Sequence, residues 1–201
     1  QYQRVDYLGV AFADEGVALR EAGIKTPIIV MNPEQNSFDL MIEHQLEPEV
    51  YNFLVLSKFG EAVKNAGGKH YPIHLKLDTG MHRLGFMEHE INQLIDELKE
   101  QNSIKVKSVF SHLAASDEDM HDFFTRQQIQ LFDAVSEKIV KALRYPVLRH
   151  ISNSAGIERF SEAQFDMVRL GIGLYGISAV NQEQLATVST LKSTVIQVKQ
   201  V

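Results

Sequence analysis

Strand-type and helix-type segments alternate along almost the whole chain, and this alternation restricts the fold more than any other feature. Strand patterns are centred near residues 7, 29, 50, 74, 108, 149 and 169, and a helical pattern follows each of the first six. Strict alternation of this kind predicts an α/β fold with a parallel sheet. Seven strands are one fewer than a closed (β/α)8 TIM-type barrel contains, and such a barrel places its chemistry at the carboxyl ends of its strands.

The pattern changes after Tyr175. The apolar residues of the last segment, among them Val188, Leu191 and Val195, have no helical spacing and are typical of an unpaired β segment. We therefore predict that residues 1–180 form the barrel. Residues 181–201 are expected to be a linker and the first strand of a C-terminal β domain.

Composition narrows the classes of partner and compartment. The net charge of −6 comes without a basic block, which disfavours nucleic acid and anionic membranes as partners. The chain has no cysteine, which excludes disulfides and thiolate chemistry and fits a reducing cytoplasm. It also contains no apolar run of about 20 residues and no signal-peptide pattern. We expect a cytoplasmic protein with a small-molecule ligand.

Polar residues gather where the predicted strands end. Residues 74–85 read His-Leu-Lys-Leu-Asp-Thr-Gly-Met-His-Arg-Leu-Gly, so that a strand runs into a polar corner with cations on both sides of the turn. Similar positions after other strands complete the set: Lys76, Asp78, Arg83, His112, His150, Asn153, Ser154, Arg169, Gly171 and Gly173. In a barrel these side chains converge on one mouth. Cations and hydrogen-bonding groups without a carboxylate pair favour an anionic ligand.

Each candidate also has a purely structural interpretation. Ser154 precedes a short helix and fits a phosphate cradle or an ordinary N-cap. Arg169 interrupts an apolar strand and fits a cofactor contact or an internal ion pair. His112 and His150 fit catalytic roles or a satisfied core. A metal site is disfavoured, because His70, His74 and His82 lack helical i, i+4 pairing and the acidic run after residue 116 suits a solvated surface.

Four motifs resemble one family in order and content. They are residues 75–85, residues 111–117 (Ser-His-Leu-Ala-Ala-Ser-Asp), residues 150–155 (His-Ile-Ser-Asn-Ser-Ala) and residues 167–176 (Met-Val-Arg-Leu-Gly-Ile-Gly-Leu-Tyr-Gly). Together they resemble the N-terminal barrel of alanine racemases, the fold-type III pyridoxal-phosphate enzymes. Residues 10–23 are similar to the family's second β/α unit, so the resemblance implies a barrel that lacks its first β/α unit.

The resemblance implies a role for each matched residue. Arg83 would contact the substrate carboxylate and the cofactor's phenolic oxygen, and Lys76 would be carbamylated to hold Arg83. His112 would pack on the pyridine ring, with Arg169 facing the pyridine nitrogen and His150 supporting that arginine. The phosphate of pyridoxal 5'-phosphate would lie on Ser154, Gly171 and Ile172, with Asn153 in the same pocket. The catalytic set would be Arg83, His112 and Arg169.

The implied function is interconversion of L- and D-alanine for bacterial peptidoglycan synthesis, by a homodimer of the full-length protein. The family's Schiff-base lysine lies in a Lys-Ala-Asn-Ala-Tyr-Gly-His segment that this sequence does not contain, and its second acid/base tyrosine belongs to the C-terminal domain. We therefore expect the chain to be inactive alone. His82 stands where many relatives have glycine. Racemisation of another amino acid such as serine, a non-catalytic pyridoxal-phosphate barrel and a barrel for another phosphorylated metabolite remain as alternatives.

Overall fold

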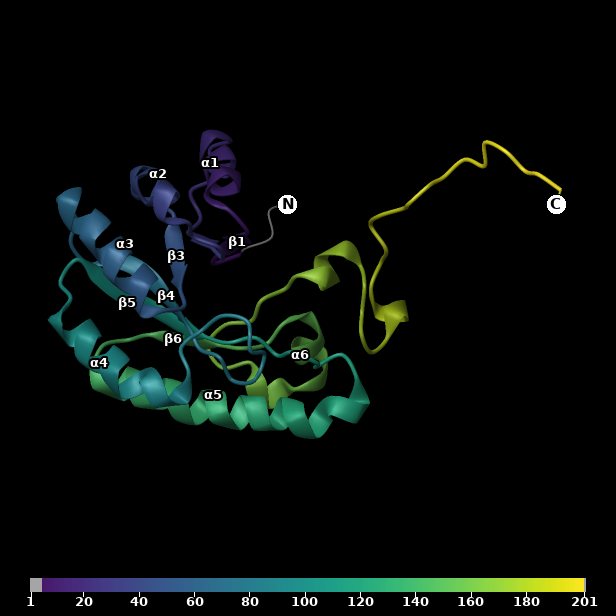
Figure 1. Ribbon diagram of the computed structural model, residues 1–201. Helices are drawn as coiled ribbons and strands as arrows, with labels where there is room; N and C mark the ends of the chain where they lie inside the picture. The colour runs from purple at the N-terminus through teal and green to yellow at the C-terminus, as the bar shows by residue number, and fades with distance from the viewer. Residues whose placement is uncertain (1–4, 201) are drawn as a thin grey trace.

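The protein contains one six-stranded parallel sheet whose strands lie side by side in chain order. The computed structural model describes residues 5–200, so residues 1–4 and 201 of the two predicted domains lie outside it. The strands are β1 (Leu8–Val10), β2 (Ile28–Val30), β3 (Glu47–Val50), β4 (Tyr71–Lys76), β5 (Ile104–Phe110) and β6 (Leu148–His150). Doubly wound sheets reverse their strand order at a switch point, whereas barrels keep it. The curled half-barrel in Figure 1 thus confirms the predicted fold class.

One helix follows each strand; α1 to α5 lie on the outer side of the sheet, whereas the short α6 lies beyond the carboxyl ends of the strands (Figure 1). The helices are α1 (Ala13–Glu21), α2 (Phe38–Glu43), α3 (Phe53–Asn65), α4 (Ile91–Glu100), α5 (Asp122–Leu143) and α6 (Ser154–Arg159). In α4 the apolar residues recur every three or four positions, and Ile91, Leu94, Ile95 and Leu98 are all buried. Their contact with the strands' outward side chains, such as Ile73 and Val109, forms the hydrophobic core.

The opposite face of the strands is polar. Side chains alternate between the two faces of a strand, so Ile73 and Leu75 of β4 enter the core while His74 and Lys76 point to the inner side of the curve. Barrel interiors are usually filled with branched apolar side chains. Here the inner positions of β3 to β6 include charged and polar residues that are buried: Glu49, His74, Lys76, Ser108 and His150.

Two predicted strands differ from the structure. The strand expected near residue 50 is β3, Glu47–Val50, and it ends before Asn52, which caps α3 by accepting a hydrogen bond from Val55 N at 2.8 Å. The strand expected at residues 167–175 is wrong, and a 3₁₀ turn occupies Ile172–Tyr175. That segment meets β6 and the residues just after it through isolated backbone bonds such as Arg169 N to Ser152 O at 3.0 Å. No described strand supports its other side.

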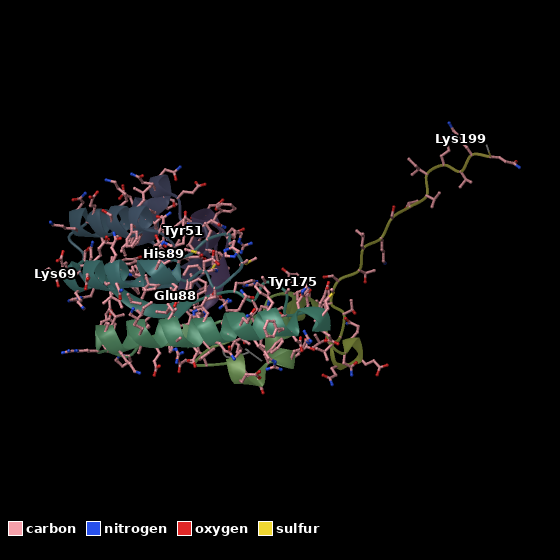
Figure 2. The ribbon with its side chains drawn as sticks, turned by 60° about the horizontal axis from the view of Figure 1, so that its bottom comes forward. Tyr51, Lys69, Glu88, His89, Tyr175 and Lys199 are labelled. Carbon is pink, nitrogen blue, oxygen red and sulfur yellow. The ribbon has the colours of Figure 1, made fainter. Side chains whose placement is uncertain are left out.

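Residues 185–200 form neither a helix nor a paired strand. Figure 2 shows this tail leaving the body of the molecule, with Tyr175 near its start and Lys199 near its far end. A strand is defined by its partner, so the predicted start of a C-terminal domain stays a prediction. Among the described residues, no helix combines the length and the apolar character needed to span a membrane.

Candidate functional site

A cavity of about 650 Å³ lies beyond the carboxyl ends of β5 and β6. Six of the residues that the sequence singled out line it, from three separate chain segments: His112, Asn153, Ser154, Arg169, Gly171 and Ile172. Lys76 lies below the cavity in the barrel interior, and Arg83 lies on the loop after β4; neither lines the cavity wall. The structure thus brings most of the candidates together at one rim.

Ser154 organises the glycine-rich side of the cavity. Its Oγ accepts hydrogen bonds from Gly171 N at 3.0 Å and Gly173 N at 3.1 Å. The predicted alternative, an ordinary N-cap, is met instead by Asn153, whose Oδ1 accepts from Gly156 N at 2.9 Å. A Cβ added at Gly171 would meet nothing within 4 Å, so open space adjoins this backbone.

Arg169 is held by neutral acceptors. Its Nη1 donates to His150 Nδ1 at 2.6 Å, and its Nη2 donates to Ser111 O at 2.7 Å and Ile151 O at 3.0 Å. Within residues 5–200 no carboxylate forms a salt bridge with it, so the alternative of an internal ion pair is not met. Burial lowers its pKa to about 10, which Glu49 partly opposes, and the guanidinium stays charged at neutral pH.

His112 presents a neutral ring to the cavity. Burial lowers its pKa to about 4, with Arg169, Lys76 and Arg83 contributing in the same direction. Arg169 Nη2 approaches His112 Nδ1 at 3.3 Å, and a guanidinium can only donate. The imidazole proton therefore lies on Nε2, and the flat face of the ring is available for stacking.

Lys76 has a buried partner that the sequence did not reveal. Its Nζ lies 3.7 Å from Glu49 Oε1 and 4.4 Å from the centre of the Phe110 ring. Burial lowers the pKa of Lys76 to about 8 against the opposing effect of Glu49. Burial likewise raises the pKa of Glu49, while Lys76, Arg169 and Arg83 lower it. The two-residue period of β3 could have placed Glu49 on the inner face of the sheet. The Glu-Pro-Glu sequence of residues 47–49, however, resembles a loop.

The loop that carries Arg83 is shaped by Asp78 and Gly85. Asp78 Oδ1 accepts from Gly80 N at 2.9 Å and His82 N at 3.0 Å. Gly85 has φ +128°, and an added Cβ would lie 2.5 Å from Asp78 N. His82 has φ +53°, a conformation that favours glycine. Arg83 is exposed, and its charge acts on Lys76 and His112.

Residues 1–179 match the family model described as alanine racemase, N-terminal domain. The chain is 35% identical over 176 residues to the alanine racemase of Symbiobacterium thermophilum, covering 86% of this chain and 45% of the relative. It is 37% identical over 190 residues to that of Thermodesulfovibrio yellowstonii, covering 92% and 49%. The chain spans about half the length of these relatives.

Solved structures give the same result. The alanine racemase of Clostridium difficile 630 superposes with a TM-score of 0.83 at 32% identity, covering 92% of this chain and 49% of that one. A complex of that racemase with cycloserine gives 0.83 at 31% identity, with 92% and 51% covered. The family match, the strand order and the motifs around the cavity agree, and the chain belongs to the alanine racemase N-terminal domain family.

Proposed function

We propose that this chain is the cofactor-binding barrel portion of a pyridoxal-phosphate-dependent racemase that interconverts L- and D-alanine. The observation that supports this most is the cavity beyond β5 and β6, where three distant motifs of the family line one space. The relatives are named alanine racemases. A role in peptidoglycan synthesis, a cytoplasmic location and a homodimeric full-length enzyme belong to the same proposal.

The residues around the cavity fit pyridoxal 5'-phosphate. The open space beside Gly171 and the hydroxyl of Ser154 suit a phosphate group, with Ile172 and Asn153 on the same wall. The neutral ring of His112 suits a stacked pyridine, and Arg169 suits the ring nitrogen. When bound, this cofactor withdraws electrons from the bond to the α-hydrogen of an amino acid.

The chain's own charges would then bind and orient the carboxylate of the amino acid. The charges of Lys76, Arg169 and Arg83 all lower the pKa of the buried Glu49. Arg83, on its exposed loop, would bind the substrate carboxylate through its planar fork. Arg169 keeps its proton at neutral pH, and this would leave the facing ring nitrogen without one, a state that favours rapid return of the α-proton over side reactions.

Carbamylation of Lys76 is also part of the proposal. Its lowered pKa of about 8 provides a fraction of neutral amine, which is the form that reacts with carbon dioxide. Glu49 offers an alternative to the carbamate, because its carboxylate already lies 3.7 Å from the amine of Lys76. The intact mass of the protein in bicarbonate tests the point, since one carbamate adds a defined mass that is lost on acidification. An unchanged mass would refute it.

The proposed division of the chain predicts its activity. Residues 1–180 would be an incomplete barrel and residues 181–201 a linker with the start of a C-terminal β domain. Neither the family's Schiff-base lysine nor its C-terminal tyrosine has a counterpart in this sequence. The purified chain should therefore not convert L-alanine to D-alanine in a coupled D-amino-acid oxidase assay. Measurable turnover would refute this division.

Binding can be tested without catalysis. Deoxypyridoxine 5'-phosphate lacks the aldehyde, so surface lysines cannot capture it, and titration calorimetry should detect one site on the purified chain. Inorganic phosphate should compete with it. Absence of binding by the chain and by a longer protein that carries the complete barrel would contradict the proposed function.

A further inference from the structure

A continuous chain of hydrogen bonds, buried at its centre and partly buried at both ends, crosses the barrel interior from Glu47 to Arg169. Glu47 Oε2 lies 2.7 Å from His74 Nε2, and His74 Nδ1 lies 2.6 Å from Ser108 Oγ. Ser108 Oγ lies 3.0 Å from His150 Nε2, whose Nδ1 is 2.6 Å from Arg169 Nη1. We call these five residues, Glu47, His74, Ser108, His150 and Arg169, the interior relay.

Four consecutive strands supply the first four members. Register places His74 of β4 opposite Ser108 of β5 and sets β6 beside β5 with Phe110 opposite His150. The side chains of His74, Ser108 and His150 are inaccessible to solvent, and that of Glu47 is 12% exposed. His150 is fixed further by stacking on Phe110, with ring centres 4.8 Å apart and planes within 4°. The relay therefore runs from near the surface to the cavity wall without a break.

The two ends of the relay determine the direction of every proton in it. A guanidinium only donates, so His150 Nδ1 accepts from Arg169 and the His150 proton lies on Nε2. Ser108 Oγ then accepts from His150 and has its own proton for His74 Nδ1. His74 consequently carries its proton on Nε2 and donates it to Glu47, which as a carboxylate only accepts. All four bonds point from the cation toward the anion, an arrangement in which each bond strengthens the next.

We propose that the interior relay is a positioning device in which Glu47, His74 and Ser108, acting through His150, fix the orientation of the Arg169 guanidinium at the cavity wall. None of these three residues lines the cavity. Glu47 supplies the anionic end of the relay, while Glu49 is the carboxylate whose charge acts directly on Arg169, and within residues 5–200 no carboxylate lies within salt-bridge distance of that guanidinium. In the proposed function, on which this last consequence rests, the oriented guanidinium meets the ring nitrogen of the cofactor.

The first experiment determines which ring nitrogen of each relay histidine carries the proton, in the purified chain without any ligand. With ¹⁵N-labelled histidine, two-bond ¹H–¹⁵N spectra should show His74 and His150 each as a single Nε2–H tautomer. Ser108→Ala removes the central link and should give mixed tautomers at both histidines. Glu47→Gln keeps the shape but not the charge, and should perturb His74 most and His150 less. A His150 proton on Nδ1 in the wild-type chain, or unchanged tautomers in Ser108→Ala, would overturn the proposal.

Ser136→Ala is the matched control. Ser136 is equally buried, but its Oγ bonds to Arg149 Nε and Asp133 O on the outer side of the molecule. This variant should leave the tautomers of His74 and His150 unchanged. A change equal to that of Ser108→Ala would show that loss of any buried serine hydroxyl has this effect, and would overturn the proposal. Where Ser108→Ala fails to fold, Glu47→Gln still tests the proposal, because Glu47 lies at the accessible end.

The second experiment links the relay to the cavity. Deoxypyridoxine 5'-phosphate should bind about tenfold more weakly to Glu47→Gln than to the wild-type chain, equivalent to about 1.4 kcal/mol, because the guanidinium is less well oriented. Inorganic phosphate, which needs only the Ser154 side, should bind both equally. Equal affinity for the pyridine ligand would refute the positioning role. If the wild-type chain binds no pyridine ligand, the proposed function fails while the tautomer test of the relay stands.

Discussion

Glu49 should contribute more to folding stability than Lys76, although the two form one buried pair. Three variants test this: Glu49→Gln, Lys76→Met and the double variant. The substitutions keep side-chain length and remove one charge each. At the observed 3.7 Å, attraction between unit charges is about 4.5 kcal/mol for an effective dielectric constant near 20. Breaking such a pair by removing one partner typically costs about 3–5 kcal/mol.

The surroundings make the two costs unequal. Without Glu49, the charges of Lys76, Arg83 and Arg169 repel one another, and among residues 5–200 no other acidic side chain is classed as buried. Without Lys76, Glu49 retains the attraction of both arginines. The loss of unfolding free energy in Glu49→Gln should therefore be at or above the upper end of that range. The loss in Lys76→Met should be at or below its lower end. The double variant should lie within about 2 kcal/mol of the wild type, because removing both charges also removes both desolvation penalties.

Urea unfolding followed by far-ultraviolet circular dichroism at pH 7 and fixed salt gives all four free energies of unfolding, provided that the slopes agree. The double-mutant cycle then isolates the interaction between the two side chains. A larger loss for Lys76→Met than for Glu49→Gln would refute the charge argument. Strict additivity of the two single losses would refute the pairing itself.

Three other predictions concern pH, the glycines and Arg169. Because the pKa of Lys76 falls from 10.5 to about 8 on folding, the unfolded chain holds this proton between those pH values while the folded chain has released it. The free energy of unfolding should thus rise with pH in this window by up to about 1.4 kcal/mol per unit relative to Lys76→Met, and a flat difference curve would contradict the shift. Gly171→Ala should leave urea stability within about 0.5 kcal/mol of wild type yet weaken binding of deoxypyridoxine 5'-phosphate, whereas Gly85→Ala should be strongly destabilising since its Cβ would overlap Asp78 N. Unchanged affinity of Gly171→Ala for deoxypyridoxine 5'-phosphate would show that the backbone at Gly171 does not contact this ligand. Arg169→Glu, placed in a longer protein that racemises alanine, should begin to form pyruvate by transamination, and an unchanged product profile would argue against the assigned role of Arg169.

Local sequence patterns predicted most of the fold because each β/α unit carries its own signals. A strand is predicted around residue 74, and β4 is Tyr71–Lys76, since period-2 alternation ends at the polar corner. The error at residues 167–175 has a different origin. That segment has the composition of a strand, but a strand also requires neighbours on the sheet, and composition carries no information about them.

The site residues that the sequence identified also differ in position from those that it missed. Residues directly after strands, such as His112 and Ser154, were identified because the barrel geometry brings strand ends together. Glu47, Glu49 and Ser108 were missed because they lie within strands, where a polar residue normally indicates the solvent side. Only the curvature of the sheet, which encloses its inner face, makes those positions buried.

The sequential strand order has a consequence for handling the protein. β1 pairs with β2 on one side, and no described strand pairs with its other side. An exposed row of backbone amides and carbonyls is a template for strands of other molecules. Concentrated samples of this chain should therefore associate through the free edge of β1, and a short strand-forming peptide that pairs with β1 should block this association.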